Sequence, residues 1–497
     1  MSGVELGGLD RESSWAGVRA VVAGFGVSGA AAADTLQHLG ASVVVVDERP
    51  RDQFTEQADL LELLGVDLRL GPGSTTDLPD ADATDVDLVV TSPGWRPDSP
   101  LLVRAAERGV PVWSEVELAW RLRRPDDAPW LVVTGTNGKT TTVQMLEEIL
   151  RADGRRAAAV GNVGRPVVEA VMDDEPYDVL AVEVSSYQLH WTDSLSPLAS
   201  VVLNVAPDHL DWHGGLDQYA AAKAKVYHHT QVACVYNAQD ERTERMVEDA
   251  DVVEGCRAIG FTVGIPAPSE IGLVEDVLAD RAFVKERIST AAELAHLSDL
   301  GADPPPHVVQ NALAAAALAR AFGVSPRAVR DGLRAFRLDE HRGAEVAVID
   351  DVLWVDDSKA TNTHAAEAAL GGVGRAVWIA GGLAKGASFD ELVERTRRHL
   401  RAVVLIGADA DVIAEALARH APDVPVTHVD SSHTGLMDRV VEAAAGLAQP
   451  GDTVLLAPGC ASMDQFVSYR DRGDQFAAAV LRRESVQRGP GNGETDG

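Results

Sequence analysis

Residues 130–142 constrain the fold most, because they combine an apolar run, a glycine-containing turn and the start of a helical pattern. This order predicts a buried strand, a tight loop and a helix. In such a unit the backbone N–H groups and the helix N-terminus bind phosphate, Lys139 reaches the terminal phosphates and Thr140 can hold Mg²⁺. The usual pattern has four residues between its glycines, whereas two separate Gly135 from Gly138 here. The alternative is an ordinary strand–helix turn with a solvated lysine.

The composition excludes several classes of partner. Acidic residues outnumber basic residues by 76 to 44, which gives a net charge of −32. Such a surface repels phosphate backbones and anionic lipids, so we expect no nucleic acid and no membrane as partners. No apolar run reaches the ~18 residues of a membrane span, and the N-terminus lacks the pattern of a secretion signal. We therefore expect a cytoplasmic protein, and we expect it to be a monomer.

Length and cysteine content set further bounds. The 497 residues suffice for two to four domains, each with its own core. The cysteines, Cys234, Cys256 and Cys460, show no paired spacing. A disulfide framework or a zinc site is therefore not expected.

A second glycine-rich turn lies near the N-terminus. Residues 18–23 predict a strand, and Gly24, Gly26 and Gly29 follow with G-x-G-x-x-G spacing before an Ala-rich helix. Asp47 ends the next predicted strand, about 20 residues on, where it can accept a hydrogen bond from a sugar hydroxyl or a base N–H. The pattern predicts a nucleotide-phosphate site without saying which nucleotide binds. The alternative is a Rossmann-like turn kept for packing.

Polar side chains follow several of the predicted strands. Ser92 follows one in the N-terminal part, and Asn162, Glu183 and His209 follow strands after the phosphate loop. Because the carboxyl ends of parallel strands meet at one edge of a sheet, we expect the last three to lie together with Lys139. A carboxylate and an imidazole there would suit divalent cations beside phosphates. For each residue alone, the alternative is a solvated Glu or a structural His.

The C-terminal third repeats the α/β pattern. Residues 352–356 predict a strand that runs into Asp357 and Lys359, and residues 377–380 predict one that leads to Lys385. The two lysine-bearing loops indicate anion binding, with plain surface lysines as the alternative. Residues 250–300 show little periodicity, and residues 281–284 are expected to form a short antiparallel strand. Lys223 lies in a predicted helix, and the sequence pattern alone gives no reason to single it out.

The charged and proline-flanked stretch at residues 121–129 indicates the first domain boundary, and the second is placed near residues 341–343. The chain is therefore expected to be an α/β protein of three domains: a Rossmann-like domain, a central domain with a parallel sheet like that of P-loop ATPases, and a second Rossmann-like domain. The expected bounds are 1–122, 123–338 and 339–485. The last residues, 486–497, are polar and glycine-rich, and they predict a disordered tail.

Five stretches together resemble the Mur ligase family, the ATP-dependent amino-acid-adding enzymes of peptidoglycan synthesis. They are the loop from Gly135 to Thr142, Glu183-Val-Ser-Ser, Asn204-Val-Ala-Pro-Asp-His209, His341-Arg342 and Asp357-Ser-Lys-Ala-Thr-Asn362. The short phosphate loop is that family's variant. The last stretch and Pro458-Gly-Cys-Ala-Ser-Met-Asp-Gln-Phe466 resemble the branch that adds D-glutamate to UDP-N-acetylmuramoyl-L-alanine. The sequence departs from the usual pattern in three places, at Pro207, at Gly459 and at Leu383-Ala384, and none of these changes removes a functional side chain.

The resemblance implies roles for individual residues. The first domain would bind the UDP part of the substrate and no NAD, through Gly26, Val27, Ser28, Asp47, Arg49 and Ser92, with Asn162 and Ser185 nearby. ATP would be bound by Gly135, Thr136, Asn137, Gly138, Lys139, Thr140, Thr141, Asn311, Arg342 and Asp357. Magnesium, expected at two sites, would be held by Thr140, Glu183, His209 and Lys223, the last as a carbamate. D-Glutamate would lie among Lys359, Thr361, Lys385, Ser462 and Tyr469.

The implied reaction is amide-bond formation. ATP would convert the L-alanyl carboxylate into an acyl phosphate, and the amine of D-glutamate would then displace phosphate, with Lys139, Glu183, His209 and Lys223 as the catalytic set. Three alternatives remain at this point. They are a Rossmann oxidoreductase, a nucleotide-binding protein without turnover, and a sister ligase that adds a different amino acid.

Overall fold

The computed structural model describes the chain in six stretches, which are residues 5–79, 86–162, 164–301, 304–337, 341–430 and 435–488. They form two compact units. The first unit comprises Met1–Val205 and Asp217–Phe336, and the second comprises Ala206–Leu216 and Arg337–Gly497. The predicted α/β class is confirmed in both. The three-domain bounds remain a prediction.

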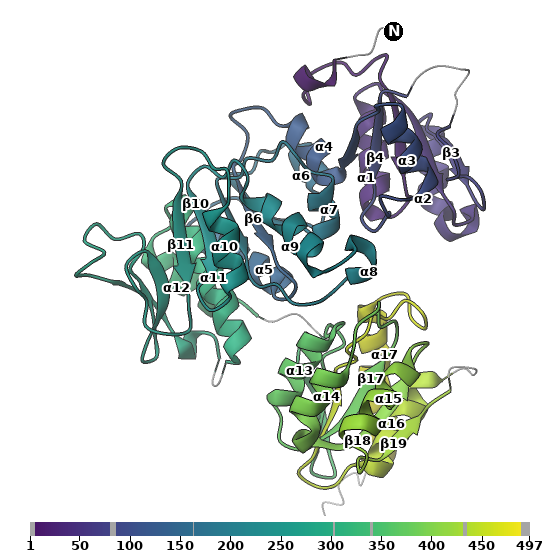
Figure 1. Ribbon diagram of the computed structural model, residues 1–497, viewed down its shortest axis with the longest axis vertical. Helices are drawn as coiled ribbons and strands as arrows, with labels where there is room; N and C mark the ends of the chain where they lie inside the picture. Colours follow the sequence, from purple (N-terminus) through teal and green to yellow (C-terminus); the bar gives the residue numbers. More distant parts are fainter. Residues whose placement is uncertain are drawn as a thin grey trace, which may run out of the picture. The chain divides into compact units, whose positions relative to one another are not determined.

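The N-terminal part of the first unit is a five-stranded parallel sheet in the order β3-β2-β1-β4-β5 (Figure 1). Its strands are β1 (Arg19–Ala23), β2 (Ser42–Asp47), β3 (Asp67–Leu70), β4 (Leu88–Thr91) and β5 (Val112–Ser114). The helices of this part are α1 (Val27–His38), α2 (Thr55–Leu63), α3 (Pro100–Glu107) and α4 (Glu115–Leu122). The order reverses at β1, so the loops after β1 and β4 form the crevice in which such folds bind ligands.

The rest of the first unit is built on a nine-stranded sheet in the order β14-β13-β12-β11-β10-β9-β6-β8-β7. Its parallel strands are β6 (Trp130–Thr134), β7 (Ala157–Gly161), β8 (Val179–Glu183), β9 (Ala199–Val202), β10 (Ala233–Asn237), β11 (Arg257–Phe261) and β12 (Glu270–Val274). Antiparallel β13 (Val277–Asp280) and β14 (Ala292–His296) complete it. Its helices are α5 (Lys139–Ala152), α6 (Val167–Val171), α7 (Ser186–His190), α9 (Leu216–Ala224), α10 (Glu241–Glu248), α11 (Pro306–Phe322) and α12 (Pro326–Ala335).

The strand expected at residues 281–284 is wrong. β13 ends at Asp280, and the buried Asp280 carboxylate accepts the N–H groups of Ala282 and Phe283, each at 2.8 Å. These bonds turn the chain away from the ladder, because an Asp side chain that binds the backbone two or three residues on stabilises a turn. Arg320 of α11 holds the other oxygen of Asp280 at 2.9 Å.

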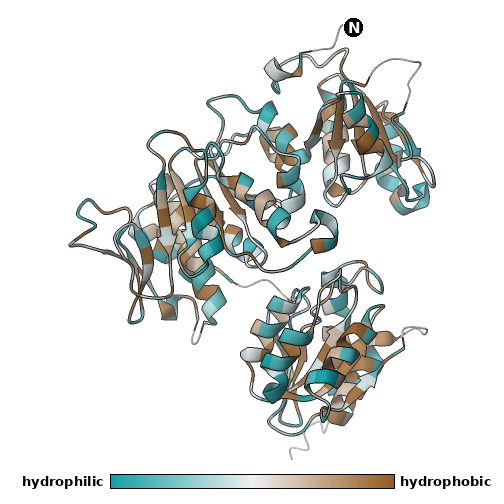
Figure 2. Cartoon of the chain, viewed as in Figure 1, coloured by the Kyte–Doolittle hydropathy of each residue, from teal (hydrophilic) through white to brown (hydrophobic). Residues whose placement is uncertain are grey.

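The core of the nine-stranded part packs α5, α11 and α12 against the sheet, and the central strands are strongly hydrophobic (Figure 2). Gly332 of α12 sets the approach of that helix to α5, because a Cβ at this position would lie 2.4 Å from the Cα of Ile149. In α11 the run from Ala312 to Ala319 is fully buried. This packing holds α5, and with it the loop that precedes α5, rigidly against β6.

The second unit contains a six-stranded sheet in the order β15-β16-β20-β17-β18-β19, in which only β15 is antiparallel. Its strands are β15 (Ala344–Ile349), β16 (Val352–Asp356), β17 (Ala376–Gly381), β18 (Leu400–Ile406), β19 (Val426–His428) and β20 (Thr453–Leu456). The helices are α8 (Leu210–His213), α13 (Thr363–Gly371), α14 (Asp390–Thr396), α15 (Ala410–His420), α16 (Leu436–Leu447) and α17 (Tyr469–Arg488).

The chain end departs partly from expectation. Helix α17 runs to Arg488, so it includes the first three residues of the predicted disordered tail, and residues 489–497 lie outside the described residues. Within the parts of the chain that the structure describes, no helix is both long and apolar enough to cross a membrane.

Candidate functional site

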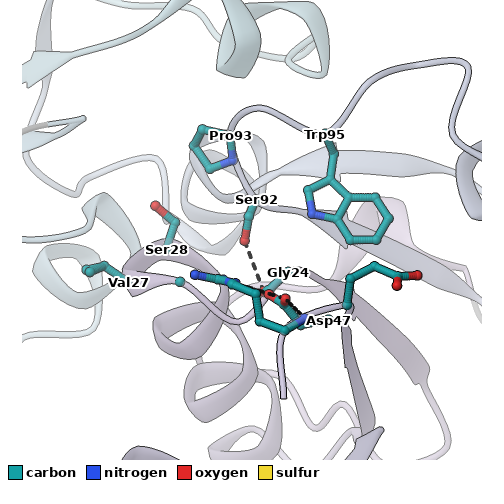
Figure 3. A pocket seen from close by; sticks show the side chains of 10 residues that line it. Gly24, Val27, Ser28, Asp47, Ser92, Pro93 and Trp95 are labelled. Atoms are coloured by element: carbon teal, nitrogen blue, oxygen red, sulfur yellow. Dashed lines mark hydrogen bonds and ion pairs between the residues drawn. The ribbon is translucent and has the colours of Figure 1, made fainter. Parts of the chain in front are cut away.

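An open pocket of about 470 Å³ lies at the carboxyl ends of β1, β2 and β4 (Figure 3). Its walls contain all six residues predicted from the first domain for the UDP part of the substrate. They also contain four that were not singled out for this role. The lining residues are Gly24, Gly26, Val27, Ser28, Asp47, Glu48, Arg49, Ser92, Pro93 and Trp95.

Gly24 lies in close contact with two other residues of this pocket. Its φ is +98°, and a Cβ there would lie 2.8 Å from the indole Nε1 of Trp95 and 2.9 Å from the Oγ of Ser92. Ser92 in turn donates its hydroxyl to the Gly24 carbonyl at 3.0 Å (Figure 3). The indole therefore lies directly against the glycine loop, and Trp95 is a wall residue that the glycine spacing does not reveal.

Asp47 is fully engaged by its neighbours. Its two oxygens accept four hydrogen bonds, from the Phe25 N–H at 2.7 Å and from the N–H, Nε and Nη2 of Arg49 at 2.7–3.0 Å. Burial raises its pKa, but the hydrogen bonds from Arg49 and Phe25 outweigh burial and leave it below its usual value. A carboxylate offers about four acceptor positions, so in this arrangement Asp47 holds Arg49 and the loop. Its predicted role as an acceptor for the ligand remains a prediction.

The phosphate loop has the predicted strand–loop–helix form. Gly138 is the N-cap of α5 with φ +86°, and a Cβ there would lie 2.3 Å from the side-chain oxygen of Asn311. Asn204, just after β9, accepts the Thr136 N–H with its carbonyl at 3.0 Å and the Asn137 N–H with its side-chain oxygen at 3.0 Å. The loop is therefore clamped from β9 on one side and from α11 on the other.

Two lysines converge on this loop. The Nζ of Lys139 donates to the carbonyl oxygens of Gly135 and Thr136, both at 2.9 Å. The Nζ of Lys223 donates to the same Gly135 oxygen at 2.9 Å, and it lies 4.4 Å from the ring centroid of Tyr219. Lys223 is 1% exposed. A helical lysine that the sequence pattern left unremarkable is thus buried beside the phosphate loop.

Asn162 and Glu183 are brought together as predicted. Asn162 donates its side-chain amide to Oε1 of Glu183 at 3.0 Å, and its backbone N–H to the Glu183 carbonyl at 3.0 Å. Oε2 of Glu183 is buried and has no hydrogen-bond partner among the described residues. Ser185 is the N-cap of α7, where it forms a capping box with Gln188. Thr140 and Thr141 are buried in the first turn of α5.

His209 belongs to the second unit, where it lies beside Asp208 with Nε2 3.4 Å from Oδ2. Its φ is +53°. The other oxygen of Asp208 lies 3.9 Å from Nζ of Lys385. The predicted meeting of His209 with Lys139, Asn162 and Glu183 remains a prediction, because those three belong to the first unit. Throughout the described stretches, no three His, Cys, Asp or Glu side chains form a ready-made metal site.

Asp357 follows β16, next to the neighbouring strand β20. Burial raises the pKa of Asp357 to about 7, although the positive charge of Arg342 acts to lower it. The adjacent Asp356 pairs with Nδ1 of His341 at 2.6 Å. Lys359 lies with Nζ 4.0 Å from the ring centroid of Tyr469, and Thr361 donates its N–H to the Lys359 carbonyl at 2.8 Å.

Arg472 is a residue that the sequence analysis missed. It is fully buried, and its guanidinium donates to Oγ of Ser358 at 2.9 Å, to the Ser358 carbonyl at 2.8 Å and to the Cys460 carbonyl at 3.2 Å. Burial lowers its pKa to about 10. It ties the loop after β16 to the loop after β20, which carries the buried Ser462. An arginine within a polar helix start carries no sequence signal for this role.

Three protein-family models match successive parts of the chain. Residues 18–114 match the description "Mur ligase MurD-like, N-terminal domain", residues 133–319 the "Mur ligase middle domain", and residues 341–460 the "Mur ligase, glutamate ligase domain".

Curated relatives extend this similarity. The chain is 60% identical over 468 residues to the UDP-N-acetylmuramoylalanine–D-glutamate ligase of Streptomyces avermitilis, which covers 94% of this chain and 99% of the relative. It is 51% identical over 484 residues to the ligase of the same name from Leifsonia xyli. This match covers 94% of this chain and 93% of that relative.

Solved structures share the fold at lower identity. The UDP-N-acetylmuramate-alanine ligase MurC of Thermotoga maritima matches with a TM-score of 0.55 and 19% identity, over 94% of this chain and 99% of that one. The MurF ligase of the same organism, solved in complex with ADP, matches with a TM-score of 0.55 and 16% identity. This match covers 89% of this chain and 96% of that one.

Proposed function

The chain belongs to the Mur ligase family, and from this premise we propose that it joins D-glutamate to UDP-N-acetylmuramoyl-L-alanine with the use of ATP. The observation that carries this proposal is the 60% identity, along 94% of the chain, to a relative named for that activity. The reaction is the formation of an amide bond in the synthesis of peptidoglycan precursors. The oxidoreductase and the turnover-free nucleotide-binding protein are thereby set aside.

The pocket of the first unit is proposed to take the UDP end of the substrate. Arg49 supplies the positive charge there, and Asp47 keeps its guanidinium in place. Arginine, with its fixed fork of donors, suits diphosphate oxygens. Gly26, Val27 and Ser28 add backbone N–H groups at the start of α1, and Ser92 and Trp95 close the opposite wall. Asn162 and Ser185 are proposed to contact the muramoyl part.

ATP is proposed to bind at the phosphate loop. The N–H groups of residues 138–141, at the start of α5, are proposed to donate to the terminal phosphates. The ammonium of Lys139 would turn to the transferring phosphoryl group from its resting contacts with Gly135 and Thr136. Asn311 of α11 lies close against Gly138, where a Cβ would come within 2.3 Å of its side-chain oxygen. Arg342 and Asp357 are proposed to hold the nucleotide from the second unit. The N–H donors at the helix start are fixed, and such donors lower the barrier because charge develops where they already point.

The residues present fit a magnesium ion. Among the described residues, Oε2 of Glu183 is a buried acceptor without a hydrogen-bond partner, and such burial is costly unless a cation balances it. Thr140 offers a hydroxyl beside the phosphates, and Lys223 offers a second anion once its amine carries a carbamate. Magnesium, when bound, neutralises charge on the phosphoryl group during transfer. A pair of ions, with His209 as a further ligand, is the arrangement proposed.

The use of lysine in this chain supports these assignments. Lysine occurs six times among 44 basic residues, at positions 139, 223, 225, 285, 359 and 385. Four of the six are residues proposed for the site, whereas all the other basic residues apart from Lys225 and Lys285 are arginines. Lysine is a compact point charge, and unlike arginine it can form a carbamate. Lys359 and Lys385 are proposed to bind the two carboxylates of D-glutamate, with Thr361, Ser462 and Tyr469 around them.

The proposed chemistry proceeds in two stages. Lys139 stabilises charge while the L-alanyl carboxylate attacks the γ-phosphorus of ATP, which forms an acyl phosphate and ADP. Lys359 and Lys385 orient D-glutamate so that its amine attacks the acyl carbon. Phosphate then leaves, and a proton from the amine passes to solvent. The cytoplasmic location and the monomeric state remain predictions.

The deciding experiment measures phosphate release with ATP, Mg²⁺ and UDP-N-acetylmuramoyl-L-alanine while the amino acid is varied. D-Glutamate should support turnover, whereas L-glutamate, L-alanine, L-lysine and meso-diaminopimelate should not. Turnover that is equal or greater with another of these amino acids would identify a sister ligase instead. Phosphate release without any amide product would contradict the ligase assignment.

A further inference from the structure

Two of the three cysteines lie side by side in the first unit, although they are 22 positions apart in the sequence. Sγ of Cys234 and Sγ of Cys256 are 3.8 Å apart, and both thiols are free. Cys234 lies in β10 opposite Ala258 of β11, and Cys256 stands two positions before Ala258. Cys256 thus stands immediately before β11, and its sulfur lies beside that of Cys234 in the neighbouring strand.

The two thiols differ in access to solvent. Cys234 is 2% exposed, whereas Cys256 is partly exposed and lies among exposed neighbours that include Val253. The thiol–thiol contact with Cys234, helped by backbone N–H groups, lowers the pKa of Cys256 despite burial, and the same contact raises the pKa of Cys234. Cys256 is therefore the thiol that ionises first and that a small solute reaches first.

We propose that Cys256 and Cys234 form a peroxide-sensitive dithiol, in which Cys256 reacts with a hydroperoxide and Cys234 resolves the product into a disulfide. The Cys256 thiolate attacks one peroxide oxygen, the O–O bond breaks, and the departing oxygen takes a proton from solvent, which leaves a sulfenic acid on Cys256. The Cys234 sulfur then attacks the Cys256 sulfur, an S–S bond forms, and the S–O bond breaks as water leaves with the Cys234 proton. Two thiols lose two electrons, and the peroxide bond accepts them.

Local geometry permits the required approach. A disulfide needs the sulfurs to close from 3.8 Å to about 2.05 Å. Cys256 precedes β11 in a turn, where its N–H is held by the Val253 carbonyl at 3.0 Å and Gly255 has φ +92°. The turn can therefore adjust while Cys234 stays fixed in the sheet. Cys234 lies near the amino end of β10, whereas the phosphate loop follows the carboxyl end of β6. The cross-link therefore leaves the phosphate loop free, and activity should persist.

The test uses the full-length protein treated with hydrogen peroxide, then denatured and alkylated with N-ethylmaleimide for mass spectrometry of its peptides. We expect two of the three thiols to become inaccessible to alkylation, and a linked Cys234–Cys256 peptide lighter by two hydrogens, both reversed by dithiothreitol. Cys460 is the internal control, because it is fully buried in the second unit. The proposal is overturned if all three thiols remain alkylated, or if Cys460 is consumed as fast as the pair.

Variants separate the two roles. In Cys234→Ala the sulfenic acid on Cys256 has no resolving partner, so dimedone should label Cys256 there and not in the wild type. In Cys256→Ala the buried Cys234 should stay unlabelled. Cys234→Ser serves as a second variant, since the hydroxyls of Ser200 and Thr230 can accommodate a serine. Absence of dimedone label on Cys256 in folded protein of either Cys234 variant overturns the assignment.

Discussion

Lys139 and Lys223 donate to the same acceptor, the carbonyl oxygen of Gly135, each at 2.9 Å. One lies in the first turn of α5 and the other in α9. Two ammonium groups so close together, with Lys223 buried, repel each other strongly, because the interior screens charge weakly. A carbamate on Lys223 would keep an N–H for Gly135 and replace the second positive charge by a negative one. This geometry makes Lys223 the more informative of the two positions to change.

Lys223→Ala should lower the rate of phosphate release by about 100-fold, as expected when one preorganised charge at a phosphoryl-transfer site is removed. Added acetate or formate should restore part of the rate by supplying the missing carboxylate. Lys225→Ala is the matched control, because Lys225 lies two residues on and pairs with the exposed Asp193 at 3.0 Å. Its rate should stay near that of the wild type. Loss of activity in Lys223→Ala without any rescue would contradict the carbamate.

Gly138→Ala should abolish ATP binding, as measured by calorimetry. The new Cβ would lie 2.3 Å from Oδ1 of Asn311 and so push the loop and α11 apart. Gly154→Ala is the control, because Gly154 has nearly the same φ, +81° against +86°, but no atom within 4 Å of a Cβ. Both variants should lose about 1–2 kcal/mol of stability from the left-handed conformation. Equal ATP affinity in the two variants would show that the close approach of Gly138 to Asn311 is not needed for ATP binding.

Trp95→Ala should raise the KM for the UDP-linked substrate by about tenfold, the order expected for loss of one aromatic wall against a nucleotide. The KM for ATP and kcat should change little, because Trp95 lines the first-unit pocket and not the phosphate loop. Trp95→Phe should recover most of the affinity. Arg96→Ala, in the same loop but with an exposed side chain, should behave as the wild type. A raised KM for ATP would argue against the pocket assignment.

Glu115→Gln should remove part of the pH dependence of stability. Burial raises the pKa of Glu115 from 4.5 to about 7, and Oε2 has no partner among the described residues, although Oε1 accepts the Val168 N–H at 2.6 Å. The folded protein therefore binds this proton more tightly than the unfolded chain, and the free energy of unfolding falls as pH rises from about 4.5 to about 7. As pH rises over this range, the free energy of unfolding of the wild type should fall by about 3 kcal/mol relative to that of Glu115→Gln.

Thermal denaturation of both proteins at several pH values checks this prediction. Asp357 also has a raised pKa, but it is present in both proteins, so its contribution cancels in the comparison. Parallel curves of Tm against pH for the two proteins would mean that Glu115 ionises normally in the fold.

Local patterns predicted the binding loops well. The glycine spacings after β1 and β6, and the apolar runs before them, depend on neighbours within about ten residues, and both turns have the predicted form. The same reasoning failed at residues 281–284. There the side chain of Asp280, held from α11 by Arg320, ends the strand. A hydrogen bond to a residue 40 positions away leaves no periodic trace in the sequence.

The sequence by itself determined the α/β class, the glycine loops and the family, because those depend on the order of residues along the chain. Only the tertiary structure decided that Lys223 reaches Gly135, that Asp47 accepts the Phe25 N–H, and that Cys234 meets Cys256. Burial and hydrogen bonding at these places arise when distant strands and helices pack together. The phosphate loop at residues 135–141 could thus be recognised from its own residues. Lys223 was singled out only by the family resemblance, and its burial beside the loop is seen only in the folded chain.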